Sequence, residues 1–194
     1  MKNSKALGLL LLAACGDSKE LVLRTSLADG GTVVVGTPCV PLMEQSTTFD
    51  GYRLSEVSVE SAAGNPPGGA VCIGFDFQGL TTCPYGQDAD GGSPSGQPCT
   101  TPDGMPVVGA VAPQCTNHRP SQSVVWSCLC ANVDGQTNDG QTYCDCPTGT
   151  SCVQTLTALN GSTALTGAYC LPSAEAKADR GCASECQPGT EPCD

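Results

Sequence analysis

The sequence predicts a small, mainly β, disulfide-rich fold with short antiparallel strands, long Gly/Pro loops and one or two short helices. Three observations support this fold class. The chain has 194 residues, of which 15 are Cys, a density typical of exported domains that disulfides hold together. Glycine contributes 24 residues and proline 15, which favours turns over long helices. Aromatic residues make up only 4% of the chain, so the apolar core is small for this length.

Strands are expected where apolar and β-branched residues gather or alternate with others. Residues 21–27 and 32–35 flank the turn Asp29-Gly30-Gly31 and predict a hairpin. Residues 52–60 are a further strand candidate. In residues 71–77 every second side chain is large and apolar, which predicts a half-buried strand.

The segment from 87 to 106 is rich in Gly, Pro, Ser and Asp and has no strand pattern. A loop of this length needs a covalent brace, and a bridge from Cys99 to Cys83 would supply it. Residues 107–111 are expected to return as a short strand.

The second half of the chain predicts one strand and two helices. Val124, Trp126, Cys128 and Cys130 would share one face of a strand, which would place the only Trp against the sulfur atoms. A helix is expected at residues 152–159. A shorter one is expected at 174–180, capped by Ser173.

We take Pro113 as a boundary between a β-rich and a cysteine-dense region. The expected regions are a lipoprotein signal peptide at 1–14, a lipidated tether at 15–20, a β-rich region at 21–113, a cysteine-dense region at 114–172 and a cysteine-containing tail at 173–194. No internal repeat of fixed period is visible in the sequence.

The N-terminus carries an export signal. Lys2 and Lys5 form a short basic segment, and an apolar run follows from residue 6 to residue 14. This run is far shorter than the ~20 residues that cross a bilayer, so it predicts a signal peptide and not a membrane span.

The end of the apolar run predicts attachment to lipid. Its sequence, Leu12-Ala13-Ala14-Cys15-Gly16, resembles the lipobox of bacterial lipoproteins, in which a cysteine receives lipid and becomes the mature N-terminus. Two or more acyl chains anchor a protein stably to a membrane. By the same resemblance, Gly16 at the second mature position is compatible with sorting to the outer membrane. The alternative is an ordinary secretory signal, cut after Ala14 without lipid.

Removal of residues 1–14 changes the charge and the cysteine count. The mature chain loses Lys2 and Lys5 and keeps 6 basic against 19 acidic side chains, a net charge of −13. This charge argues against nucleic acid as a partner. Once Cys15 is committed to lipid, an even number of cysteines remains, as complete pairing requires. The disulfide candidates are Cys39, Cys72, Cys83, Cys99, Cys115, Cys128, Cys130, Cys144, Cys146, Cys152, Cys170, Cys182, Cys186 and Cys193.

Two Cys-x-Cys pairs form the most specific constellation of the sequence. Residues two apart on an extended strand point to one side, so the two pairs could face each other across a hairpin closed by residues 132–141. We favour disulfides that leave each pair, either across the hairpin or to one of Cys115, Cys152 and Cys170. A four-thiolate zinc site is an alternative, although structural zinc sites usually have longer spacings. A redox-active pair is another, although it needs a lowered thiol pKa and no basic residue is adjacent.

The cysteine-dense part of the chain resembles a known group of proteins. The segments 126–130, 143–152 and 165–170 are similar to a block shared by cysteine-rich predicted lipoproteins of myxobacteria, and residues 82–88 and 96–99 resemble an upstream block of the same family. The similarity spans residues 48 to 172 and implies a disulfide-rich fold of the cell envelope. It implies no activity, so no catalytic residue is carried over.

Other residues offer little chemistry. Asp88 and Asp90 resemble the start of a calcium loop, but the later ligand positions carry Gly92, Ser93 and Cys99, so both are weak calcium candidates. The single histidine, His118, lies in a loop-like segment with no acid nearby in sequence and predicts a surface residue. No catalytic residue, resident metal or cofactor is assigned.

The sequence therefore predicts an exported, acidic protein of the bacterial cell envelope, anchored by lipid in the outer membrane. Its expected role is that of a structural or interaction module with a protein or glycan partner. The alternatives are a small envelope enzyme that hydrolyses glycan or peptide with carboxylates, and a surface protein that binds divalent metal.

Overall fold

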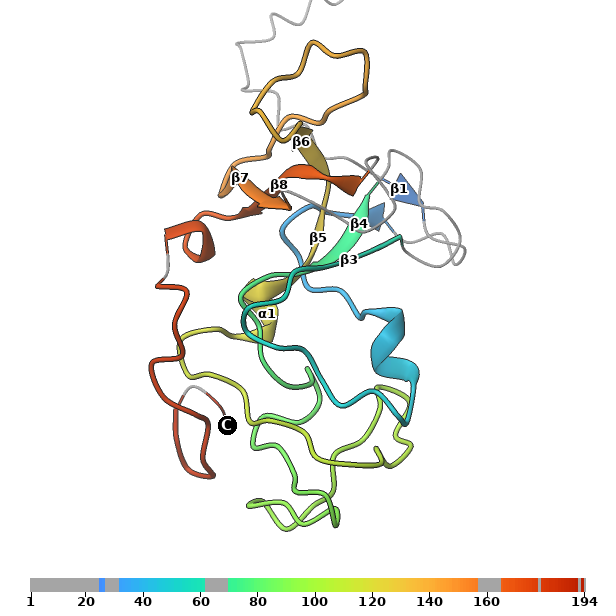
Figure 1. The fold of residues 1–194 in the computed structure, drawn as a ribbon, viewed down its shortest axis with the longest axis vertical. Coiled ribbons are helices and arrows are strands. Elements are labelled where there is room, and N and C mark those ends of the chain that lie inside the picture. The colour runs from blue at the N-terminus through green and yellow to red at the C-terminus, as the bar shows by residue number, and fades with distance from the viewer. Residues whose placement is uncertain are drawn as a thin grey trace, which may run out of the picture.

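The computed structural model describes residues 25–26, 32–61, 70–156, 165–177, 179–191 and 193. Its elements in chain order are β1 (Thr25–Ser26), β2 (Thr32–Val33), the 3-10 turn η1 (Leu42–Gln45), β3 (Ser58–Ser61), β4 (Val71–Gly74), α1 (Pro120–Ser123), β5 (Val124–Ser127), β6 (Leu129–Ala131), β7 (Thr150–Leu156), β8 (Gly167–Pro172) and the 3-10 turn η3 (Glu175–Lys177). All strand pairs are antiparallel. Figure 1 shows the strands gathered in the upper half and the loops of residues 80–115 below them. The small, mainly β, disulfide-rich fold class is confirmed.

The central sheet has the strand order β3-β4-β5 and carries the main core. Ile73 of β4 lies opposite Val59 of β3 on one side and Val125 of β5 on the other. Ile73 and Val125 are completely buried and pack with Phe75 and with apolar residues of β7 and β8. This sheet takes its strands from both sides of Pro113.

Strand β4 is buried on both faces, so the half-buried strand predicted for residues 71–77 is wrong in that respect. One face joins the main core, and the other carries Cys72, which forms a bridge to Cys39. Because residue 72 lies opposite Trp126, the tryptophan packs in the cluster around this bridge and not against the Cys-x-Cys pairs. The strand ends at Gly74, before Asp76, which has a positive φ of 49°.

The second sheet has the strand order β6-β8-β7. The chain passes from β5 to β6 at Cys128, so residues 124–130 form strands of two different sheets and not the single strand that we predicted. Ser127 contributes to this break, because its Oγ donates a hydrogen bond to the Cys170 carbonyl at 2.8 Å.

The predicted helix at residues 152–159 is wrong. Residues 150–156 form β7, and residues 157–159 lie outside the described part. β-branched side chains at 150, 153 and 155 favour an extended backbone, and each of the residues 150–154 has a partner in β8. Tertiary pairing therefore decides the conformation of this segment.

The helix predicted at residues 174–180 is replaced, among the described residues, by a short 3-10 turn. Only η3 forms there, and Ser173 bonds the hydroxyl of Ser151 at 2.8 Å instead of capping a helix. The helix α1, which was not predicted, is a single turn that starts with Pro120 at a position where proline is well tolerated.

Three predicted strands are present only in part. The hairpin of residues 21–35 is represented by β1 and β2, while 21–24 and 27–31 lie outside the described part. Of residues 52–60 only the end forms β3, and Tyr52 instead pairs with Gly79 in an isolated bridge. Residues 107–111 form no strand, and of them only Val111 makes an isolated bridge, to Gln87.

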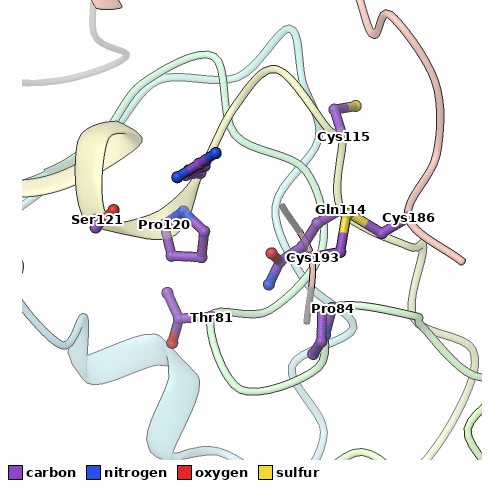
Figure 2. A pocket seen from close by; sticks show the side chains of 9 residues that line it. Thr81, Pro84, Gln114, Cys115, Pro120, Ser121, Cys186 and Cys193 are labelled. Carbon is purple, nitrogen blue, oxygen red and sulfur yellow. A yellow bond between two sulfur atoms is a disulfide. The ribbon is translucent and has the colours of Figure 1, made fainter. Parts of the chain in front are cut away.

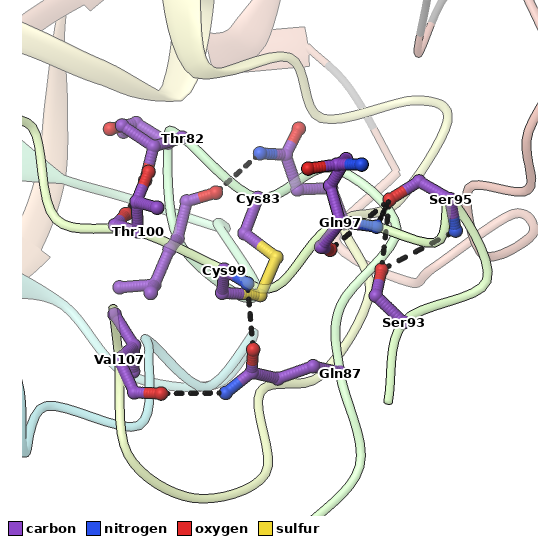
Figure 3. Close-up of a disulfide and its surroundings, with 12 residues drawn as sticks. Thr82, Cys83, Gln87, Ser93, Ser95, Gln97, Cys99, Thr100 and Val107 are labelled. Carbon is purple, nitrogen blue, oxygen red and sulfur yellow. Dashed lines mark hydrogen bonds between the residues drawn. A yellow bond between two sulfur atoms is a disulfide. The ribbon is translucent and has the colours of Figure 1, made fainter. Parts of the chain in front are cut away.

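The lower loops are held by a disulfide and by one buried amide. The bridge Cys83–Cys99, with 5.2 Å between the Cα atoms, forms as the sequence predicts. Beside it, the Gln87 side chain donates to the carbonyls of Val107 and Gly109 and accepts from the Cys99 N–H at 2.7 Å (Figure 3). These contacts order a segment in which few backbone groups are paired in strands.

The C-terminal tail returns along residues 114–116. The bridge Cys115–Cys182 joins positions 67 residues apart, and the N–H of Thr116 donates to the Ser184 carbonyl at 2.9 Å. Beyond it, Cys186–Cys193 closes a short loop with a separation of 7.

The two tail bridges predict different losses of stability. In the chain-entropy model, replacing Cys115 and Cys182 with serine removes roughly 4.4 kcal/mol, because their bridge closes a long loop, whereas removing Cys186–Cys193 costs about 2.4 kcal/mol. Urea unfolding of both double variants measures the difference. An equal or reversed order would contradict the role assigned to the longer bridge.

Candidate functional site

The described part of the chain offers four sites for chemistry, which are a cluster of disulfides, a buried histidine and two surface hollows. The disulfide cluster lies on the second sheet. Its three bridges are Cys128–Cys144, Cys130–Cys152 and Cys146–Cys170. Each Cys-x-Cys residue is bonded outside its own pair, as expected, but only Cys128–Cys144 spans the predicted hairpin.

The sulfur atoms of different bridges lie close together in this cluster. The Sγ atom of Cys170 is 3.9 Å from that of Cys128 and 3.7 Å from that of Cys144. Among the described residues, two groups of three sulfur atoms lie close enough together to hold a metal ion. They are the Sγ atoms of Cys128, Cys144 and Cys170 and those of Cys130, Cys146 and Cys170. Metal ligation requires thiolates, and here every one of these sulfurs is in a disulfide. The cluster is therefore structural in this state.

His118 is completely buried, so the prediction of a surface residue is wrong. Its Nδ1 lies 2.7 Å from Oε1 of Glu175, which is also buried. Asn117 accepts the Ala183 N–H on Oδ1, and this orients its Nδ2 toward His118 Nε2 at 3.0 Å. Nε2 also lies 3.2 Å from the Gly181 carbonyl oxygen, so this nitrogen has an amide and a carbonyl within hydrogen-bond distance, while Nδ1 faces the Glu175 carboxylate. Both ring nitrogens are thus occupied in joining residues 117–118 to the tail.

No local signal in the sequence identifies this contact. Glu175 is 57 residues from His118, and the bridge Cys115–Cys182 brings their segments together. Next to the pair, the carboxylate of Asp76 lies 3.7 Å from the Arg180 guanidinium, which also covers the ring of Phe75. Burial raises the pKa of the Asp76 carboxyl, while the Arg180 charge opposes that shift.

The carboxylates suggested for calcium serve as turn acceptors. Asp88 Oδ1 accepts the N–H groups of Asp90 at 3.1 Å and Gly92 at 2.7 Å. Such contacts are typical of an Asx turn. Calcium binding at Asp88 and Asp90 stays a prediction.

Two hollows lie where three extended segments meet. The N–H of Gln114 donates to the Pro84 carbonyl at 2.9 Å, and the N–H of Cys186 donates to the Gln114 carbonyl at 2.8 Å. Neighbouring residues in extended segments point to opposite sides. Accordingly Pro84, Gln114 and Cys186 line one hollow, whereas Tyr85, Pro113 and Gln187 line the other.

The first hollow has a volume of about 350 Å³ and contains the positive charge of Arg119. Figure 2 shows Thr81, Pro120 and Ser121 on one side of it and Gln114 with the Cys186–Cys193 bridge on the other. The second has a volume of about 470 Å³ and is more apolar, with Tyr85, Pro94 and Val111 in its walls and Asp88 at its edge. Both volumes lie in the range of small-molecule sites.

Thr81, which lines the first hollow, is hydrogen-bonded to a buried carboxylate. Glu44 is 1% exposed and accepts hydrogen bonds from the N–H and the hydroxyl of Thr81. Burial raises the pKa of the Glu44 carboxyl above its ordinary value of 4.5, although the Thr81 hydrogen bonds oppose the shift. The same carboxylate adds to the effect of burial in raising the pKa of the Tyr52 phenol.

No family model, curated protein or solved structure matches this chain. The similarity to myxobacterial lipoproteins therefore stays a prediction that depends on the segments quoted above. Any function must be argued from the chemistry of the residues themselves.

The Glu44 environment predicts a pH-dependent stability. Because the folded pKa is raised, the folded state binds the proton more tightly, and the contribution of Glu44 to stability falls as pH rises from about 4.5 through the folded pKa. Glu44→Gln cannot ionise and keeps an acceptor for Thr81. We therefore expect the melting temperature of this variant, minus that of the wild type, to increase between pH 4 and pH 8.

The matched control is Glu185→Gln, which removes one negative charge from an exposed position. A difference for Glu44→Gln that is flat or decreasing with pH, or no larger than that of the control, would contradict the account.

Proposed function

We propose that this protein is a lipid-anchored interaction module of the bacterial cell envelope, held in the outer membrane through Cys15. The observation that carries the proposal is the use of the cysteines. The fourteen cysteines after Cys15 pair with one another in seven bridges. No other cysteine of the chain is left for Cys15, and this residue ends the segment that resembles a lipobox.

The number of disulfides supports export to an oxidising compartment. Thiols are kept reduced in the cytosol, whereas disulfides persist in the periplasm and at the cell surface. Bridges such as Cys39–Cys72 and Cys83–Cys99 lie within buried clusters, so reduction would open the interior of the protein. A protein with this construction depends on oxidation for its fold.

The described residues contain no helix that is long and apolar enough to cross a membrane. The anchor that we propose is covalent lipid on Cys15. Two or more acyl chains provide stable attachment, whereas a single chain binds reversibly.

A binding role fits the surface better than a structural role alone. The first hollow is lined in part by disulfide-bonded cysteines and prolines, and the second includes two prolines in its lining. Preformed hollows with a few polar groups are the usual form of a ligand site. Catalysis by His118 is disfavoured because the ring is buried and both of its nitrogens are occupied.

The anchor is tested by the mass of the protein isolated from its native membrane. We expect a chain that begins at Cys15, carries acyl groups on that residue, and lacks fourteen hydrogens relative to the fully reduced chain, since seven bridges form. Cys15→Ser should move the protein from the membrane to the soluble fraction. A control variant that keeps Cys15, Glu185→Gln, should remain in the membrane.

Two results would contradict the proposal. One is a mature N-terminus without lipid, and the other is membrane attachment that survives the Cys15→Ser substitution.

A further inference from the structure

We propose that the hollow beside Arg119 binds the free C-terminal carboxylate of a peptide, and that Arg119 is the residue that recognises it. This inference rests on the proposed role as an interaction module and names the class of its ligand. The hollow is lined by Arg119, Ser121, Thr81 and Gln114 together with apolar groups of proline and cystine.

Arg119 is a cation without a partner in an acidic protein. Arg53 lies 2.7 Å from Asp50, and Arg180 lies 3.7 Å from Asp76. For the side chain of Arg119, in contrast, no hydrogen bond or ion pair is formed with any described residue. With 19 acidic side chains in the sequence, an arginine that faces a hollow instead of an acid is available for an anionic ligand.

Gln114 supplies a second polar contact of fixed orientation. Its side chain is 4% exposed, and its Nε2 donates to the Leu80 carbonyl, so the amide cannot rotate without losing this bond. The oxygen Oε1 accepts no hydrogen bond from the residues that the structure describes, and it is not one of the buried unpaired atoms. Figure 2 shows the Gln114 amide projecting into the hollow. It can therefore accept an N–H group of a ligand.

These two groups supply the chemistry that binds the end of a peptide chain. A guanidinium binds a carboxylate through two parallel hydrogen bonds, and an amide oxygen accepts the last peptide N–H. Phosphate fits less well, because the hollow has a single cation and the net charge of the mature chain is strongly negative. A singly charged ligand with a neutral body is repelled least.

The walls of the hollow are held rigidly. Cys115 is bridged to Cys182, and Cys186 is bridged to Cys193, so two disulfides fix the side formed by the tail. Pro84 and Pro120 restrict the backbone at other points of the lining. Preorganised walls lose little conformational entropy on binding, which favours affinity in a small site.

The test uses the oxidised full chain and two small probes, N-acetyl-alanyl-alanine as the free acid and the same dipeptide as its C-terminal amide. Calorimetric titration should show saturable binding of the acid. Binding of the amide should be at least roughly tenfold weaker, since a charge-assisted hydrogen bond is lost. Arg119→Gln should reduce binding of the acid to the level of the amide. Arg119→Lys should give an intermediate affinity, because it keeps the charge but not the paired donors.

Arg53→Gln is the matched control, since it removes a surface cation that is not part of the hollow, and it should bind the acid as the wild type does. The Arg119 side chain forms no hydrogen bond or ion pair with the described residues, so the melting temperature of Arg119→Gln should be close to that of the wild type. Inorganic phosphate is titrated in parallel to detect general anion binding.

The inference is overturned if the acid does not saturate, if acid and amide bind equally, if phosphate binds as tightly as the acid, or if Arg119→Gln leaves the affinity unchanged. None of these results bears on the lipid at Cys15, which the mass of the native protein tests separately.

Discussion

Most of the disulfides of this protein lie inside its buried apolar clusters. Of the four buried apolar clusters in the described part of the chain, three contain cystine, namely the clusters around Cys39–Cys72, Cys83–Cys99 and the three bridges of the second sheet. Only the cluster at the centre of β4, β5 and β8 is built from other apolar side chains. Each bridge stabilises a domain by about 2–4 kcal/mol, which is large against a typical total of about 5–15 kcal/mol. Reduction of the bridges is therefore expected to remove a large share of the stability of this fold.

This constraint also shapes the surface that is available for function. Long loops and the C-terminal tail have few strand contacts, yet bridges such as Cys83–Cys99 and Cys115–Cys182 hold them against the body. The hollow that contains Arg119 exists because the tail is fixed there. The proposed dependence on an oxidising compartment and the proposed ligand site would thus have one physical origin, the disulfides that hold the loops and the tail. The proposed export and the proposed lipid anchor at Cys15 are consistent with a fold that needs disulfides and with the proposed ligand site.

The sequence predicts the composition-driven features of the fold well. The fold class follows from cysteine, glycine and proline content, and the bridge Cys83–Cys99 follows from the need to brace a long loop. The core positions of β4 follow from alternation, but the burial of its second face does not, because that face is covered by residues around Cys39, far away in sequence.

The errors arise where tertiary contacts outweigh local preference. The segment that begins at Cys152 forms a strand because β8 pairs with it and Cys130 is bonded to it. The pairing of fourteen cysteines is not determined by spacing alone, and the burial of His118 depends on a tail that the Cys115–Cys182 bridge positions. The hollow beside Arg119 combines residues from three separate stretches of chain, 81–84, 114–121 and 186–193, and local sequence carries no signal for it.

The most direct test of the account is the disulfide map of the native protein, obtained by proteolysis without reduction and mass spectrometry of the linked peptides. The account predicts seven bridges with the partners found here, including Cys115–Cys182 and the three that meet around Cys170. Free thiols among these fourteen residues in the folded protein, or a different set of partners, would contradict it.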